Sequence, residues 1–177
     1  MTTTYTDRTE LSNFQKVLLT TNGSITELLE IYLSEPIRLL KLHEHLTLIN
    51  KEIELAKNLI HKNNKVIKRE IILQGKISSN NFMYANSYIF VDNLEQKFAY
   101  KLLNTNIPIG KLWSEQKVET YKEIIDYGEE PANKLSNYFF IDSNDNLVFR
   151  TYSVFSRKKL TMIITEKFPK SYFCAKL

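Results

Sequence analysis

Two segments of the chain alternate apolar and polar positions as β-strands do, and each carries one charge in its apolar row. The rows are Ile67, Arg69, Ile71 and Leu73 in the first segment, and Met162, Ile164, Glu166 and Phe168 in the second. Because successive side chains of a strand point to opposite faces, Arg69 and Glu166 are both predicted to point inward. An unpaired charge in an apolar interior is costly, so each side chain needs a partner or a bound ligand.

Helical periodicity appears in two other places. Ser24 and Glu27 have the spacing of a capping box and precede an apolar stripe that predicts a helix ending before Pro36. Asp92, with Glu95 three residues later, is predicted to cap a second helix that ends at 104–106.

The remaining segments complete an α+β pattern. A third helix is predicted over 50–60, and 107–110 is expected to be a constrained loop, whereas 118–127 fits both periods poorly and could be strand or helix. Strands are predicted at 37–42, 66–73, 82–91, 147–155 and 160–168, with a turn at 156–159 joining the last two. Helices combined with a run of antiparallel strands predict one sheet with helices packed on one face.

Composition narrows the class of protein. No repeat or low-complexity linker divides the 177 residues, so one domain is expected over 1–177. Lysine and arginine exceed aspartate and glutamate by 24 to 20, but the excess is scattered, without the basic stripe of a nucleic-acid-binding protein. No apolar run approaches the roughly 20 residues of a membrane helix. We therefore expect a small anionic ligand, and neither a nucleic acid nor a membrane as partner.

Metal-ligating residues are few. Cys174 is the single cysteine, and His43, His45 and His61 are better explained by a solvated strand end than by a metal site. The N-terminal residues resemble neither a secretory nor a transit peptide, so the protein is expected to act where it is made. Frequent Asn, Lys, Ile, Tyr and Phe suggest an AT-rich coding genome, such as that of a plastid. The chloroplast stroma is thus the expected location if the gene is organellar, and the cytoplasm otherwise.

Arg150 belongs to the row of Val148, Tyr152 and Val154, and could be a second inward cation. Grouped with Lys68, Lys111 and Lys122, it is interpreted instead as a solvated surface charge, as most lysines and arginines are.

Two apolar or small residues are candidates for ligand contact through the backbone. Ile25 lies where a helix begins, so its N–H is free of the helix and the helix dipole favours an anion, although such an isoleucine can simply be core. Gly110 permits close backbone approach after Pro108 has fixed the chain, although a plain tight turn is an equal alternative.

Four segments, in this order, resemble the chorismate lyase-like family, with closest similarity to a hypothetical chloroplast reading frame of red-algal type. They are 18–26 (LLTTNGSIT), 69–73 (REIIL), 108–112 (PIGKL) and 164–169 (ITEKFP). The resemblance implies a six-stranded antiparallel sheet with helices and flaps that enclose a ligand. It also implies elimination of pyruvate from chorismate to leave 4-hydroxybenzoate, without metal or cofactor.

The resemblance assigns roles to particular residues. The family's ligand-binding arginine falls on Arg69 and its glutamate on Glu166, which would hydrogen-bond the ring oxygen and assist proton movement. Further contacts fall on Ile25 and Ile109, where characterised lyases carry Met and Leu, and the loop holding Ile109 includes Gly110.

Two alternatives remain for this chain. A similar fold serves as the effector-sensing domain of some transcription regulators, so a non-catalytic module that binds an aromatic acid is possible. Alternatively, Arg69 and Glu166 form a structural ion pair, or Arg69 bonds a backbone carbonyl, in a protein that acts by interaction with others.

Overall fold

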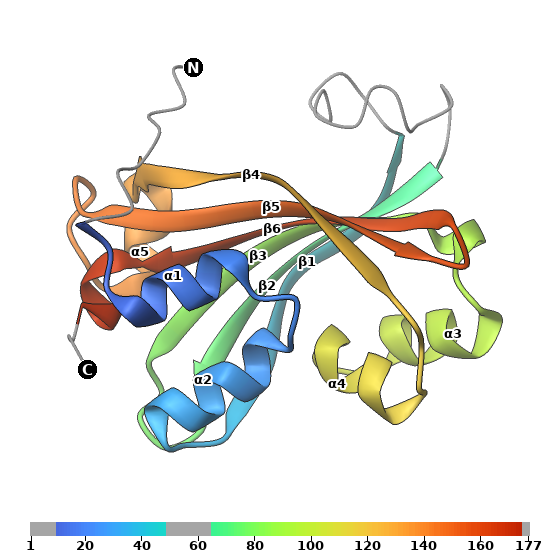
Figure 1. Cartoon of the computed structure of the whole chain (residues 1–177), viewed down its shortest axis with the longest axis horizontal. Coiled ribbons are helices and arrows are strands. Elements are labelled where there is room, and N and C mark those ends of the chain that lie inside the picture. Colours follow the sequence, from blue (N-terminus) through green and yellow to red (C-terminus); the bar gives the residue numbers. More distant parts are fainter. Residues whose placement is uncertain (1–9, 49–64, 175–177) are drawn as a thin grey trace.

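Six antiparallel strands form one sheet in this computed structural model, which describes residues 10–48 and 65–174 (Figure 1). Their order across the sheet is β1-β2-β3-β6-β5-β4. The strands are β1 (Ile37–Leu48), β2 (Lys65–Gly75), β3 (Asn81–Ile89), β4 (Tyr121–Pro131), β5 (Asn146–Ser156) and β6 (Lys159–Pro169). The predicted α+β fold with an antiparallel sheet is confirmed, and the five predicted strands are all present.

Most helices lie on one side of this sheet (Figure 1). They are α1 (Asn13–Thr20), α2 (Ile25–Leu33), α3 (Gln96–Asn104) and α4 (Ile109–Glu115). The short α5 (Ser136–Phe139) packs on the opposite face, where Phe139 joins a cluster with Ile72 and Tyr84. Three 3₁₀ turns complete the described elements: Val91–Asn93, Asn133–Leu135 and Lys170–Phe173. The main core lies between the sheet and α1–α4, and includes Leu18, Leu29, Phe98, Leu102 and Leu112.

Several predicted elements differ in detail. The prediction that Asp92 caps a helix is wrong. Val91–Asn93 is a 3₁₀ turn, Leu94 is extended, and α3 begins only after Glu95. The predicted loop at 107–110 is also wrong beyond Pro108, because Ile109 starts α4 and Pro108 occupies its N-cap. Proline has no N–H to lose there and presets the dihedral that a helix start requires. The helix predicted at 50–60, and His61, lie outside the described residues.

The ambiguous segment 118–127 contributes to β4. A bulge between Ile124 and Asp126 shifts its register against β5. One extra residue in a strand reverses which face the following side chains occupy, so the sequence could not match a period of two.

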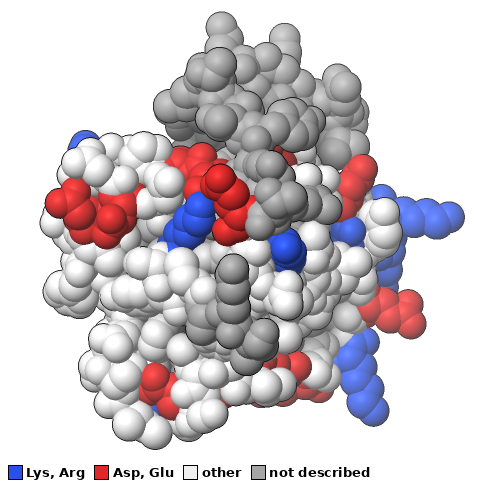
Figure 2. All heavy atoms as spheres, turned by 60° about the vertical axis from the view of Figure 1, so that its left-hand side comes forward, with Lys and Arg blue, Asp and Glu red and all other residues white. Residues whose placement is uncertain are grey.

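Charges of both signs are spread over the face in Figure 2, without a continuous basic stripe on the part of the chain described there. Within residues 10–48 and 65–174, no helix is long and apolar enough to cross a membrane. Nor do these residues contain a group of three or more His, Cys, Asp or Glu side chains placed to hold a metal ion.

Candidate functional site

Strand register brings the inward charges to one face of the sheet without pairing Arg69 to Glu166. Glu166 lies opposite Ala85 of β3 and Arg150 of β5, whereas Arg69 lies opposite Ser87 of β3. The two charges are therefore two strands apart, roughly 10 Å across the sheet, and offset along it. The alternative in which Arg69 bridges to Glu166 is wrong.

A cavity of about 50 Å³ lies between this face of the sheet and the starts of α2 and α4. Its cover consists of residues 23–26, residues 108–110 and Trp113. The sheet side is lined by Ile71, Leu73, Met83, Ala85, Ser87, Lys122, Tyr152, Ile164 and Glu166. The lining is largely apolar and contains a few polar groups, which is the usual character of a small-molecule site.

Glu166 is the acidic residue among those that line this cavity, and the residue is 6% exposed. Its Oε2 accepts a hydrogen bond from Arg150 Nε at 2.7 Å, and its Oε1 accepts one from the Tyr152 hydroxyl at 2.8 Å. Burial, and then the Glu166 charge, raise the pKa of the Tyr152 phenol well above its usual range, so this group stays a donor. Both carboxylate oxygens are therefore fixed in orientation.

Arg150 is not a solvated surface charge, and that prediction is wrong. It is 1% exposed, because the β5–β6 register points it inward directly opposite Glu166. Its Nη1 donates to the Thr21 carbonyl at 2.7 Å, which ties the sheet to the loop before α2. Burial works to lower the pKa of Arg150, but the Glu166 charge and the hydrogen bonds outweigh it and raise that pKa.

Arg69 is equally buried, at 1% exposed, but its bonding is incomplete. Its Nη1 donates to the Leu102 carbonyl at 3.3 Å, and its Nε lies 3.5 Å from Oε2 of Glu44. Neither Nε nor Nη2 has a hydrogen-bond partner among the described residues. Arg69 does not line the cavity, although its neighbours Ile71 and Ser87 do. Burial lowers the pKa of Arg69, and the Glu44 charge opposes this only in part.

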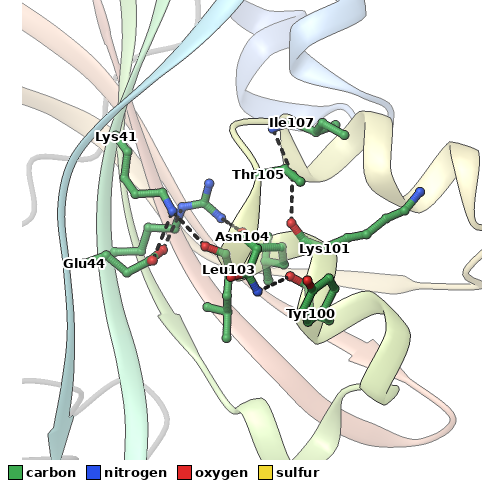
Figure 3. A network of polar contacts seen from close by, with 10 residues as sticks. Lys41, Glu44, Tyr100, Lys101, Leu103, Asn104, Thr105 and Ile107 are labelled. Carbon is green, nitrogen blue, oxygen red and sulfur yellow. Dashed lines mark hydrogen bonds and ion pairs between the residues drawn. The ribbon is translucent and has the colours of Figure 1, made fainter.

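Arg69 contacts β1 through Glu44 and the end of α3 through Leu102. Figure 3 shows Lys41 and Glu44 of β1 beside Leu103 at this end of α3. Lys41 Nζ contacts Glu44 Oε1 at 3.0 Å and donates to the Leu103 carbonyl at 3.2 Å. Leu102 and Leu103 belong to the last turn of α3, whose carbonyls lack helical donors and favour cations. Two cations thus share one carboxylate, which leaves positive charge beside the cavity.

Lys122 also departs from the prediction of a solvated surface charge. It is half-buried and lines the cavity from β4. Its Nζ donates to the Gly23 carbonyl at 3.0 Å and lies 5.1 Å from the Trp113 ring centroid and 5.6 Å from that of Tyr152. Burial lowers the pKa of Lys122, an effect that Glu166 opposes and Arg150 reinforces.

The two other lysines of that group do sit in partly exposed ion pairs. Lys68 lies 3.2 Å from Glu70 on β2, and Lys111 lies 2.8 Å from Glu30. The Lys111–Glu30 pair joins α4 to α2 beside the cavity cover.

The backbone candidates of the cover all line the cavity. Ile25 is 6% exposed at the first position of α2, and Ile109 is partly buried at the first position of α4. At Gly110 an added Cβ would lie 2.8 Å from Ser24 Oγ. A side chain at Gly110 would therefore force Ser24, the N-cap of α2, to shift where the two helix starts meet.

Sequence reasoning missed Arg150, Lys122, Tyr152 and Trp113 as site residues. Arg150 and Tyr152 share the inward row 148, 150, 152, 154, so the signal was present for them. Lys122 and Trp113 gave no such signal, because one precedes the bulge of β4 and the other lies on a helix too short to show periodicity.

Comparison with known proteins identifies a family and several relatives that this chain resembles. The family model described as chorismate pyruvate-lyase Rv2949c-like matches residues 19–175. The chorismate pyruvate-lyase of Mycobacterium leprae is 30% identical over 160 residues, covering 89% of this chain and 75% of the relative. That of Mycobacterium tuberculosis H37Rv is 27% identical over 167 residues, covering 93% and 83%. The effector domain of PhnF from Mycobacterium smegmatis has a TM-score of 0.66 at 9% identity, covering 86% of this chain and 92% of that one, which shows a shared fold.

Proposed function

Because the chain belongs to the Rv2949c-like chorismate pyruvate-lyase family, we propose that its cavity eliminates pyruvate from chorismate and leaves 4-hydroxybenzoate. The observation that carries this proposal is a buried, oriented carboxylate, Glu166, in a largely apolar cavity that Lys122 also lines. Chorismate is a dianion whose ring becomes aromatic on elimination, so an apolar enclosure with nearby positive charge matches both substrate and product.

Elimination of pyruvate from chorismate needs no external oxidant or reductant. The ether C–O bond to the ring breaks, the ring carbon that bears the hydroxyl loses a proton, and the ring becomes aromatic. The departing enolpyruvate takes up a proton and becomes pyruvate. A group that moves or holds a proton beside the ring hydroxyl is therefore the main chemical requirement.

Glu166 is proposed to fill that role as the catalytic residue. It would accept a hydrogen bond from the ring hydroxyl and assist transfer of the proton. Arg150 and Tyr152 would act as positioning residues, because their bonds to Oε2 and Oε1 fix the plane of the carboxylate.

Arg69 is proposed to bind the ring carboxylate. Its buried Nε and Nη2 donors have no hydrogen-bond partner among the described residues, and a carboxylate would satisfy them. Ile25 and Ile109 would contribute backbone N–H groups or pack on the ring, and Gly110 would keep the two helix starts close enough to enclose it.

The alternative is a module that binds an aromatic acid without turnover. One observation favours it: both oxygens of Glu166 already accept hydrogen bonds from the protein, one of them from a cation. A carboxylate held in this way can still accept a hydrogen bond from a ligand, since each oxygen has two lone pairs, and such an acceptor suffices for binding without turnover.

Pyruvate release separates the two functions. The purified chain is incubated with chorismate, and pyruvate is measured by a coupled dehydrogenase. We expect release above the uncatalysed rate, and we expect Glu166→Gln to bind 4-hydroxybenzoate while turnover falls about 100-fold or more. Wild-type release no faster than the background, together with a thermal shift on adding 4-hydroxybenzoate, would instead establish the binding module.

A further inference from the structure

Lys122 lies at the boundary between two adjacent hollows, because it lines both. Outside the cavity lies a second pocket of about 240 Å³, formed by residues that include Asn22, Glu27 and Thr120. The two hollows share Gly23, Ser24, Gly110, Trp113 and Lys122. The inner cavity, at about 50 Å³, is much the smaller of the two. A substrate larger than its ring product would therefore extend past Lys122 into the outer pocket.

The charges of the lining single out Lys122. Glu166 and Lys122 are the charged side chains among the described residues that line the inner cavity. Glu166 is neutralised by Arg150 at 2.7 Å, whereas Lys122 bonds a neutral carbonyl, that of Gly23. The nearby faces of Trp113 and Tyr152 stabilise the ammonium group as a cation. Among the described residues, Lys122 therefore has no ion-pair partner of its own, although the charge of Glu166 acts on it and the exposed Glu27 lines the outer pocket.

Other cations near the site are committed elsewhere. Arg150 bonds Glu166 and Thr21 and keeps one open nitrogen, Nη2, and Lys111 pairs with Glu30. Neither of these two lines the inner cavity or the outer pocket. Lys122 keeps ammonium protons beyond the one donated to Gly23, because a lysine has three.

On the basis of the proposed function, we propose that Lys122 binds the carboxylate of the enolpyruvyl group and so distinguishes the dianionic substrate from its monoanionic product. In chorismate the enolpyruvyl ether stands on the ring carbon next to the one that bears the hydroxyl. With the hydroxyl at Glu166, the second carboxylate lies on the Glu166 side of the ring, where Lys122 is the available cation. When the ether bond breaks, pyruvate is left at the boundary and departs through the outer pocket.

Lys122→Met tests this role, because it keeps the length of the side chain and removes its charge. We expect the KM for chorismate to rise roughly 10- to 100-fold, the loss typical of a charged hydrogen bond. The Kd for 4-hydroxybenzoate, measured by calorimetry, is expected to stay within two-fold of wild type. Lys122→Arg should recover most of the KM. Lys134→Met, an exposed lysine outside both hollows, is the control for net charge and should change neither value.

The outcomes separate the two proposals. A Lys122→Met variant that weakens both ligands equally, or neither, overturns the role of Lys122 while leaving the lyase intact. If wild type releases no pyruvate, the lyase is wrong, and the ratio of chorismate to 4-hydroxybenzoate affinity in wild type and Lys122→Met still decides the role of Lys122. A wild type that binds neither ligand overturns both. Unfolding curves of each variant confirm that it is folded.

Discussion

Two arginines on the same face of the sheet are equally buried and differently satisfied. Arg150 has an anion at 2.7 Å, a carbonyl at 2.7 Å, and one nitrogen, Nη2, without a hydrogen-bond partner among the described residues. Arg69 has a carboxylate oxygen at 3.5 Å, a carbonyl at 3.3 Å, and two nitrogens without a hydrogen-bond partner among the described residues. The pKa values move in opposite directions: burial lowers that of Arg69, whereas at Arg150 the Glu166 charge outweighs burial and raises it.

The difference shows how a structural charge can be told from a charge kept for a ligand. A buried guanidinium that bonds a carboxylate of the protein at short distance contributes to the fold, and its removal leaves that carboxylate uncompensated. A buried guanidinium that lacks such a bond and has open donors costs the fold free energy, which a ligand can recover. By this criterion Arg150 belongs to the framework that orients Glu166, and Arg69 to the proposed carboxylate site.

Replacing Arg150 should have the largest effect on stability. Arg150→Met leaves Glu166 buried without its counter-ion, so we expect the free energy of unfolding to fall by about 3–5 kcal/mol. Urea denaturation measures this change. In the double variant Arg150→Met/Glu166→Gln no buried charge is left unpaired, so much of the loss should be recovered. Additive losses in the two single variants would mean that the pair is not coupled, and would remove Arg150 as the residue that positions Glu166.

Replacing Arg69 should affect ligand binding more than stability. In Arg69→Met, Glu44 is not left without a counter-ion, since Lys41 remains 3.0 Å away, so the free energy of unfolding should be unchanged or higher. Binding of 4-hydroxybenzoate should weaken by about 1.5–3 kcal/mol, the cost of a lost charged hydrogen bond. Calorimetry and urea denaturation on the same samples give both values. A large loss of stability with unchanged binding would make Arg69 a structural residue and the proposed carboxylate site wrong.

The sequence predicted which charges point inward better than what they contact. Alternation with a period of two is a local property of a strand, so it correctly identified Arg69 and Glu166 as inward charges. It also predicted the strands of the antiparallel sheet that the structure contains. Partners depend on register between strands, which no local pattern contains. Glu166 therefore meets Arg150, a residue taken for a surface charge although it shares an inward row with Tyr152.

Irregular backbone made other parts of the site unpredictable from the sequence. The bulge between Ile124 and Asp126 interrupts the alternation of β4, so the pattern did not indicate that Lys122 lines the cavity. A second irregularity, between Lys41 and His43 of β1, brings Glu44 opposite Arg69. Bulges add one residue to one strand only, so their effect on facing becomes visible only when the partner strand is known.

The smallest effect should come from the weak counter-ion of Arg69. Glu44→Gln keeps the size of the side chain but removes the charge that lies 3.5 Å from Arg69 Nε, so an anionic ligand should experience a stronger positive field. We expect 4-hydroxybenzoate to bind about two- to five-fold more tightly at low salt, as expected for a partly exposed charge, with the gain shrinking as ionic strength rises. The matched control is Glu70→Gln, which makes the same change of net charge on the neighbouring position of β2, where the side chain points to the opposite face and pairs with Lys68. This control should leave affinity unchanged. Weaker binding in Glu44→Gln alone would show instead that Glu44 holds Arg69 in its binding position. The contrast between the two arginines would then rest on the carboxylate distance alone, 3.5 Å at Arg69 and 2.7 Å at Arg150.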